Sequence, residues 1–243
     1  MRITISIFLL AILGLSACKK DDPETPSPTI KYDIIGSVNL YDEGTASISD
    51  SGMLVTVVGS NPAITAITDN DGDFNLSEVT SGTYTLTFEK ANYGTFKRFN
   101  VDHTSNTHTI ITQNPSLGME STTSVSQLTT NISNDTVILN TTLVQNASIS
   151  NPKYVRVFMG KNSDLSAQKY DAYSPAYVKQ INPFTIKYSR TDLVDMGFQT
   201  GETVYVNVVG ESFFSNDYDD PNLNYRVFPN IFWKATTTSF IVP

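Results

Sequence analysis

Short runs in which apolar and polar side chains alternate recur along most of the chain, and clusters of Gly, Asn, Asp, Pro and Ser separate them. In residues 83–88, Tyr84, Leu86 and Phe88 fall on one face and three threonines on the other, as in a half-buried strand. From Tyr32 onward no convincing helical period appears. The pattern therefore predicts an all-β chain of antiparallel sandwiches.

One turn cluster suggests how two of these strands connect. Residues 63–68 lead into Asp69-Asn70-Asp71-Gly72, and Phe74 and Leu76 follow on one face. Asx residues and glycine tolerate the positive φ that a tight turn requires. This stretch predicts a hairpin. Counting from Asp69 places neither Gly at the sixth position nor Glu at the twelfth, so an EF-hand calcium loop is not expected.

Residues 114–118 (Asn-Pro-Ser-Leu-Gly) form the natural boundary between two domains, residues 31–113 and residues 119–243. Each has the length of an ordinary sandwich. The second half has one predicted helical turn, residues 192–196, and five predicted strands: residues 136–144, 154–159, 184–188, 203–209 and 231–242. The expected fold is thus two tandem antiparallel β-sandwich domains.

Residues 31–112 also carry an ordered series of turn and core features. The series is Gly36-Ser37-Val38, Val55-Thr56-Val57 ending at Gly59, Thr68-Asp69 with Gly72 and Phe74, Gly82-Thr83-Tyr84 with Leu86, and Lys90 to Tyr93-Gly94. It resembles the carboxypeptidase regulatory-like domain, although residues 41–52 form a longer acidic, Ser-rich stretch. The resemblance implies a seven-stranded, transthyretin-like sandwich that serves as an accessory module and has no catalytic residues. Residues 201–208 resemble the late strand of an immunoglobulin or fibronectin III-like domain.

The first residues form a predicted signal peptide, residues 1–17. Arg2 precedes an apolar run of residues 3–15, whose helix of about 20 Å would be shorter than the ~30 Å hydrocarbon core. Leu15-Ser16-Ala17-Cys18 resembles a bacterial lipobox, which implies lipidation of Cys18 after cleavage. The alternative is an ordinary cleaved signal in which Cys18 is incidental.

Residues 18–30 form a predicted tether, with Pro at positions 23, 26 and 28. Lys19-Lys20-Asp21-Asp22 resembles the acidic export signal of Bacteroidota-type surface lipoproteins, which implies an outer-membrane location facing the cell exterior. The alternative is a solvated start to the tether.

Charge and residue content exclude several functions. The 16 Lys and Arg against 24 Asp and Glu give a net charge of −8, which argues against nucleic-acid binding. One Cys and two His leave little for a zinc site or a Cys/His catalytic pair, and we expect His103 and His108 to be exposed turn residues. The sequence shows no metalloprotease, nucleophile-elbow, phosphate-loop or dinucleotide motif. We therefore expect neither an enzyme nor a cofactor.

Two sets of residues in the second half are candidate binding sites. Asp217, Asp219 and Asp220 supply hard oxygen ligands suited to calcium, or belong to a solvated loop. Aromatic residues mix with polar turn residues in two stretches, residues 170–177 and residues 213–233. This mix suits stacking on sugars, or else the rings fill the end of a sandwich. The candidate glycan contacts are Tyr170, Tyr173, Tyr177 and Tyr218, whereas Trp233 is expected in the core.

Asp135-Thr136-Val137 resembles a short acceptor pattern for O-glycosylation at Thr136 in Bacteroidota-type secreted proteins, although such a short pattern also recurs by chance.

The leading hypothesis is a non-enzymatic surface lipoprotein that acts as a binding or assembly module, with capture of glycan or another nutrient as one form of it. Its partners would be the membrane, through the lipid anchor, and a glycan or a surface protein complex. The alternative is an adhesion or pilus-like structural subunit that pairs by strand addition. A hydrolase that uses paired carboxylates is a third hypothesis.

Overall fold

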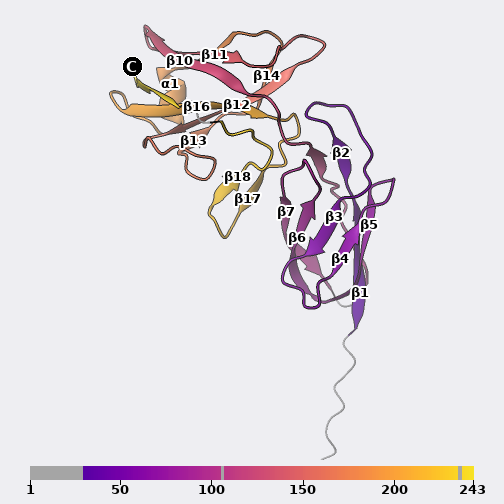
Figure 1. The fold of residues 1–243 in the computed structure, drawn as a ribbon. Coiled ribbons are helices and arrows are strands. Elements are labelled where there is room, and N and C mark those ends of the chain that lie inside the picture. Colours follow the sequence, from indigo (N-terminus) through magenta and orange to yellow (C-terminus); the bar gives the residue numbers. More distant parts are fainter. Residues whose placement is uncertain (1–29, 105–106, 235–236) are drawn as a thin grey trace, which may run out of the picture.

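The computed structural model describes residues 30–104, 107–234 and 237–243, and it is nearly all β, with one short helix (Figure 1). Two β-sandwich-like units follow one another along the chain, which confirms the predicted fold class. The predicted signal peptide, Cys18 and all of the predicted tether except Ile30 lie outside the described residues. No helix in the described part of the chain is long and apolar enough to cross a membrane.

In the first sandwich, a three-stranded sheet of order β5-β1-β8 packs against a four-stranded sheet of order β4-β3-β6-β7. The strands β2 and β9 form a separate two-stranded sheet. The strands are β1 (Lys31–Ser37), β2 (Asn39–Tyr41), β3 (Leu54–Val57), β4 (Thr65–Ile67), β5 (Asp73–Thr80), β6 (Gly82–Glu89), β7 (Phe96–His103), β8 (Thr109–Ile110) and β9 (Ser116–Gly118).

Alternation along these strands produces the first core. In β6, Leu86 and Phe88 are fully buried, as the period of two predicts, while Tyr84 is half-buried at the edge. The structure leaves no room for a side chain at Gly36 in β1, since a Cβ there would lie 2.8 Å from Ile111 Cβ and 2.9 Å from the Phe74 ring. Side chains from both neighbours of β1 in the same sheet fill this space, so the position requires glycine.

The predicted hairpin at Asp69–Gly72 is wrong in its pairing, although the turn itself forms. Gly72 has φ +81° and its N–H donates to the Asp69 carbonyl at 3.1 Å. However, β4 pairs with β3, and β5 pairs with β1 in the opposite sheet. The turn is an arch between sheets, because the same Asx-Gly chemistry serves both kinds of connection.

Two strand pairs are parallel, which the antiparallel prediction did not include: β1 with β8, and β2 with β9. One strand of the second pair, β9, lies in the predicted boundary, residues 114–118. Leu117 in β9 is buried in the first core, so the first sandwich continues to Gly118. His103 is also buried, against the expectation of an exposed turn, because its ring bonds Thr109 Oγ1 at 2.8 Å and the Val79 carbonyl at 3.1 Å.

In the second sandwich, a sheet of order β10-β11-β15 packs against a sheet of order β13-β12-β16-β19, in which β14 also pairs with β12. Its elements are β10 (Val125–Ser133), β11 (Thr136–Leu143), β12 (Lys153–Gly160), β13 (Ala172–Tyr173), β14 (Tyr177–Lys179), β15 (Phe184–Ser189), α1 (Arg190–Asp195), β16 (Thr203–Glu211), β17 (Tyr218–Asp220), β18 (Tyr225–Val227) and β19 (Thr238–Ile241). The predicted helical turn is α1, which Ser189 and Asp192 begin with a capping box.

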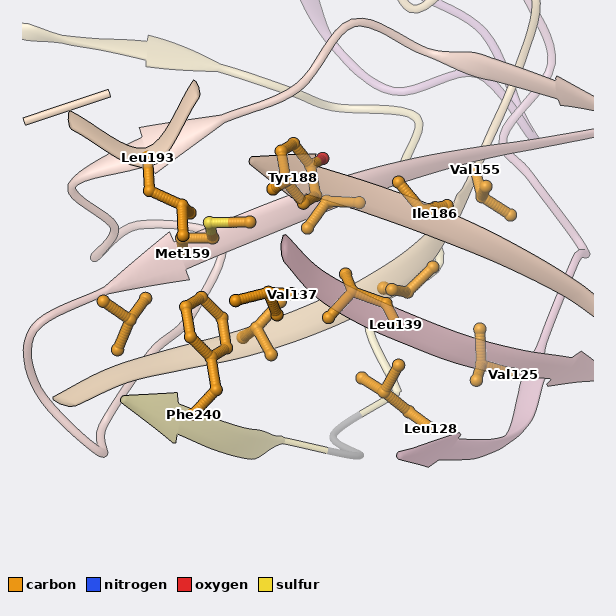
Figure 2. Packing of buried hydrophobic residues seen from close by; sticks show 14 of the residues in the cluster. Val125, Leu128, Val137, Leu139, Val155, Met159, Ile186, Tyr188, Leu193 and Phe240 are labelled. Atoms are coloured by element: carbon orange, nitrogen blue, oxygen red, sulfur yellow. The ribbon is translucent and has the colours of Figure 1, made fainter. Parts of the chain in front are cut away.

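Side chains from both sheets interdigitate in the second core (Figure 2). Val137 and Leu139 of β11 face Val155 and Met159 of β12, and Leu193 of α1 covers one end. Each of these residues is at most 1% exposed. Burial of this apolar area is the main stabilising contribution to this domain.

Several strands of the second sandwich differ from the sequence prediction, and the short strands β13, β14, β17 and β18 were not predicted. β10 was not predicted, because a bulge between Val125 and Gln127 shifts the register and only Val125 and Leu128 of its residues are buried. The predicted strand at residues 231–242 is reduced to β19, with an isolated bridge between Phe232 and Gly210 before it.

Candidate functional site

Residues 212–230, which leave β16, pack against the first sandwich, and we call them the inter-domain segment. They carry β17 and β18, which lie beside the first domain in Figure 1. Near the start of the segment, the N–H of Phe213 donates to the Glu43 carbonyl at 2.9 Å. The next ring, Phe214, stacks on Tyr41 with centroids 4.1 Å apart. The segment therefore joins the two sandwiches by side-chain packing as well as by backbone bonds.

Two buried asparagines hold this junction together. Asn216 Nδ2 donates to Asn230 Oδ1 at 2.9 Å and to the Gly118 carbonyl at 2.9 Å, and its Oδ1 accepts from Gly118 N at 2.8 Å. Asn230, which is 0% exposed, donates to the Gly118 and Phe214 carbonyls at 2.8 and 3.0 Å. Its Oδ1 also accepts from Gly94 N at 3.3 Å. We call this network the asparagine bracket.

The β17–β18 hairpin rests on β7 of the first sandwich. The Tyr218 ring lies 6.0 Å from the centroids of both Phe96 and Phe99. Beside it, Lys97 Nζ lies 3.3 Å from Asp220 Oδ2, which is almost fully buried. Burial raises the pKa of Tyr218 to about 12, with Asp220 and Tyr225 adding to the effect. Tyr218 is therefore a packing residue of the interface.

A cleft of about 480 Å³ opens where the hairpin and β7 meet. Phe99 and Asn100 form its first-domain wall, and Tyr225 and Arg226 lie on the opposite wall. The remaining lining residues are Asp219, Asp220, Pro221 and Asn224. Asn100 and Asn224 both have positive φ, which asparagine tolerates better than most residues. The cleft thus combines half-buried rings with amide, carboxylate and guanidinium groups.

Arg226 fixes the charges of the hairpin. Its Nη1 lies 3.0 and 2.9 Å from the two carboxylate oxygens of Asp219, and its Nε bonds Asp217. Burial acts to raise the pKa of Asp217, but hydrogen bonds from Ser215 and Arg226 outweigh it, so this pKa lies below its usual value. Asp217 is therefore ionised at neutral pH, and both carboxylates pair with one guanidinium.

The three candidate calcium ligands do not converge. Asp217 and Asp219 point to Arg226, while Asp220 bonds Lys97 and accepts from the Asn222 N–H at 2.9 Å. Among the described residues, no group of three or more His, Cys, Asp or Glu side chains is placed to hold a metal ion. The carboxylates instead neutralise cations and shape the hairpin, so their arrangement gives the calcium hypothesis no support.

A third hydrophobic cluster lies beneath the hairpin, on the outer face of β12 and β16. Phe228, directly after β18, is its centre and contacts Phe158, Tyr170 and Tyr173 with ring centroids 5.2, 6.1 and 4.9 Å away. Tyr170 also donates its hydroxyl to the Arg226 carbonyl at 2.5 Å. The cluster anchors the wall of the cleft to the second sandwich.

A buried ion pair supports the same cluster. Arg156 Nε donates to Glu211 Oε2 at 2.8 Å, and the two side chains are 6% and 0% exposed. The Arg156 guanidinium also donates to the Ser174 carbonyl at 2.5 Å and lies 4.4 Å from the centre of the Phe228 ring. Burial raises the pKa of Glu211 to about 7, although Arg156 acts to lower it. Sequence reasoning missed this pair, since both residues alternate with apolar positions and resemble solvent-facing strand residues.

The structure separates the four candidate glycan tyrosines. Tyr170 packs in the third cluster, 6.3 Å from Tyr225 in the cleft wall, and Tyr173 is exposed but contacts the rings of Tyr170 and Phe228. Tyr177 packs on the second core, where its hydroxyl lies 3.2 Å from that of Tyr188, and Tyr218 packs on β7. Trp233 is half-buried in the third cluster, 5.3 Å from Phe158. Thr136 is half-buried at the start of β11, directly after an exposed turn.

The cleft residues from the first domain were not foreseen from the sequence. Phe99 and Asn100 are far from Tyr225 along the chain, so only tertiary packing reveals their proximity. Tyr225 itself belongs to the aromatic stretch that the sequence singled out. The signal in that stretch was therefore useful, although it did not identify the residues that face the cleft.

Comparisons with known proteins give structural likeness only. No family model matches the chain, and no curated protein matches it. A solved "putative carbohydrate binding protein" from Bacteroides uniformis is 15% identical, with a TM-score of 0.29, over 87% of this chain and 99% of that chain. A DUF3823 family protein from Parabacteroides merdae is 11% identical, with a TM-score of 0.28, over 84% of this chain and 98% of that chain.

A chain of a type II cohesin–X–dockerin complex from Acetivibrio cellulolyticus is 24% identical, with a TM-score of 0.31. The match covers 37% of this chain and spans 59% of that chain.

Proposed function

We propose that the protein is a non-enzymatic binding module that takes up carbohydrate in the cleft between its two domains. The observation that carries this proposal is the composition of the cleft: the rings of Phe99 and Tyr225 stand beside Asn100, Asn224 and Arg226. Rings stack on the apolar faces of sugars, while amides, carboxylates and guanidinium groups bond their hydroxyls.

The two halves of the cleft are held in place before any ligand binds. The asparagine bracket and the contact of Tyr218 with β7 join the walls, and Arg226 is fixed by Asp217 and Asp219. Such preorganisation lowers the entropic cost of binding. A site between rigidly joined domains is accordingly suited to recognition.

We expect Tyr225→Ala to weaken oligosaccharide binding by about tenfold or more, because loss of one stacking contact worth about 1.4 kcal/mol changes an affinity tenfold. Tyr225→Phe keeps the ring and is the matched control, with binding expected close to wild type. The measurement is a glycan array followed by calorimetry on the best ligand. A wild-type protein that binds no oligosaccharide on the array would contradict the proposal.

We further propose that Cys18 anchors this module to the outer face of the outer membrane. The support is the sequence at residues 15–18 and the acidic segment behind it. Two or three acyl chains would hold a protein on a bilayer far more firmly than one.

For this anchor we expect Cys18→Ser to move the protein from the detergent phase to the aqueous phase in Triton X-114 partitioning. Labelled palmitate should enter the wild-type protein and not the variant. Ser16→Thr is the control, because it changes a neighbouring residue and keeps the thiol of Cys18. Equal partitioning of wild type and Cys18→Ser, with no label in either, would show that the cysteine is incidental.

An adhesion or assembly role is the second candidate, favoured by the open sheet edges of the first sandwich. β4 and β8 each pair on one side only among the described strands, and Ile67 and Ile110 on them are 69% and 63% exposed. Exposed apolar edges of this kind pair with strands from other chains.

A further inference from the structure

A second concave surface lies on the first sandwich, away from the cleft residues. We call it the isoleucine groove; it encloses about 820 Å³. Ile35 of β1, Ile67 of β4 and Ile110 of β8 contribute accessible apolar surface, since the first is half-buried and the other two are mostly exposed. Contiguous exposed apolar side chains of this kind mark interaction sites more often than isolated ones do.

The groove includes a sheet edge with accessible backbone groups. β8 runs parallel to β1, and Ile111 N donates to the Ile35 carbonyl at 2.8 Å. Because consecutive residues in a strand direct their backbone bonds to opposite sides, the N–H and C=O of Ile110 point away from β1. No other strand in the described part of the chain pairs with this edge. The rim of the groove at β8 therefore offers free hydrogen-bonding groups to an extended segment.

The charge of the groove selects among such segments. Asp69 and Asp73 are its charged lining residues, and neither forms an ion pair with a described residue. The whole chain carries a net charge of −8. A second copy of this acidic chain would therefore meet repulsion, whereas a basic segment would be attracted.

The groove is also unlike a sugar site. Its one aromatic lining residue, Phe74, is 4% exposed, so no ring is available for stacking on a sugar. Branched aliphatic side chains beside an unpaired edge suit a β-strand with alternating apolar residues.

We propose that the isoleucine groove docks an extended, basic segment of a partner protein, which lies over Ile35 between β4 and β8 and places apolar side chains against Ile35, Ile67 and Ile110. Lysine or arginine in that segment faces Asp69 and Asp73. This proposal rests on the assembly role and gives it a partner class. It is independent of the cleft, so absence of carbohydrate binding leaves it standing.

The test is a selection of displayed random dodecapeptides on the full-length protein, with counter-selection against the double variant Ile67→Ser plus Ile110→Ser. We expect enriched peptides in which apolar residues alternate and at least one Lys or Arg is present. Their affinity should fall by about tenfold or more in the double variant, because each isoleucine loses apolar contact area. Ile149→Ser, at a position that is 82% exposed in the second domain, is the matched control and should bind as wild type does.

The charge and the contact with β8 are tested separately. Asp69→Asn plus Asp73→Asn keeps the oxygen acceptors of the turn and removes both charges, so we expect weaker binding and a loss of its salt dependence. Hydrogen exchange should show slower exchange of the Ile110 amide when the selected peptide is bound.

Three results would overturn the proposal. The first is a selection that yields no peptide whose binding depends on Ile67 and Ile110. The second is enrichment of peptides without basic residues. The third is concentration-dependent self-association of the protein that Ile110→Ser abolishes, which would assign the groove to a second copy. Thermal unfolding of each variant verifies that these exposed substitutions leave the fold intact.

Discussion

Replacement of Arg156 by Met is expected to lower the free energy of unfolding by about 3–5 kcal/mol near pH 8, because it leaves a buried carboxylate without its cation. Glu211 is 0% exposed and would keep only the Ser212 N–H, 3.0 Å away, as a donor. The substitution also removes the guanidinium that covers the Phe228 ring. Chemical denaturation at several pH values measures the effect.

The loss should depend on pH in a defined direction. Burial places the pKa of Glu211 near 7 in the folded protein, above the value of 4.5 that serves for the unfolded chain. The folded state binds the Glu211 proton more tightly than the unfolded chain does. Protonation of Glu211 therefore contributes stability that is fully present below about pH 4.5 and is lost as the pH rises through 7. Without Arg156, which acts to lower that pKa, the folded value rises further, so Arg156→Met should differ least from wild type near pH 5.

Two comparisons keep this prediction specific. Arg190→Met removes an exposed pair with Asp135, whose side chains are 46% and 68% exposed, and should cost about 0–1 kcal/mol at any pH. The double variant Arg156→Met plus Glu211→Leu should recover much of the stability, since both charges leave together. An equal loss at pH 5 and pH 8 would show that Glu211 is not the cause.

Asn230→Leu is expected to lower the free energy of unfolding by about 2–4 kcal/mol and to loosen the two domains, since it leaves several buried partners unsatisfied. Gly118, Phe214 and Gly94 each lose a hydrogen bond to this side chain, and leucine has no polar atom to replace it. Small-angle scattering should show a larger radius of gyration at temperatures where both sandwiches stay folded. Oligosaccharide affinity should fall as well, because the walls of the cleft come from different domains.

The matched control is Asn131→Leu, an exposed asparagine whose amide oxygen accepts from Asn140 across β10 and β11, away from the junction. It should change neither the radius of gyration nor the affinity. If Asn230→Leu left both quantities unchanged, the asparagine bracket would not be what holds the domains together.

Local sequence patterns predicted those parts of the fold that depend on local chemistry. Sequence patterns located β11, β12, β15 and β16. A buried face of period two marks β11 and β15, whereas β12 and β16 are buried on both faces along most of their length and are marked by their Val and aromatic residues. The pattern failed for β10, where a bulge breaks the period, and for the partners of β4 and β5. Pairing of strands is decided by tertiary packing, which a turn sequence does not specify.

The candidate site was predicted in part for the same reason. The aromatic and acidic residues between Phe213 and Trp233 signalled a special segment, and that segment forms one wall of the cleft. Its carboxylates suggested calcium because the cations that pair with them, Arg226 and Lys97, are distributed along the chain. Recognition of Lys97 as a partner of Asp220 requires the contact between two domains.

Hydrogen exchange with the best oligosaccharide from the array is the sharpest test of a carbohydrate site between the domains. We expect slower amide exchange on both walls of the cleft, at residues 99–100 of the first domain and residues 219–226 of the second. Protection of one wall alone, or protection confined to the isoleucine groove, would contradict a carbohydrate site between the domains.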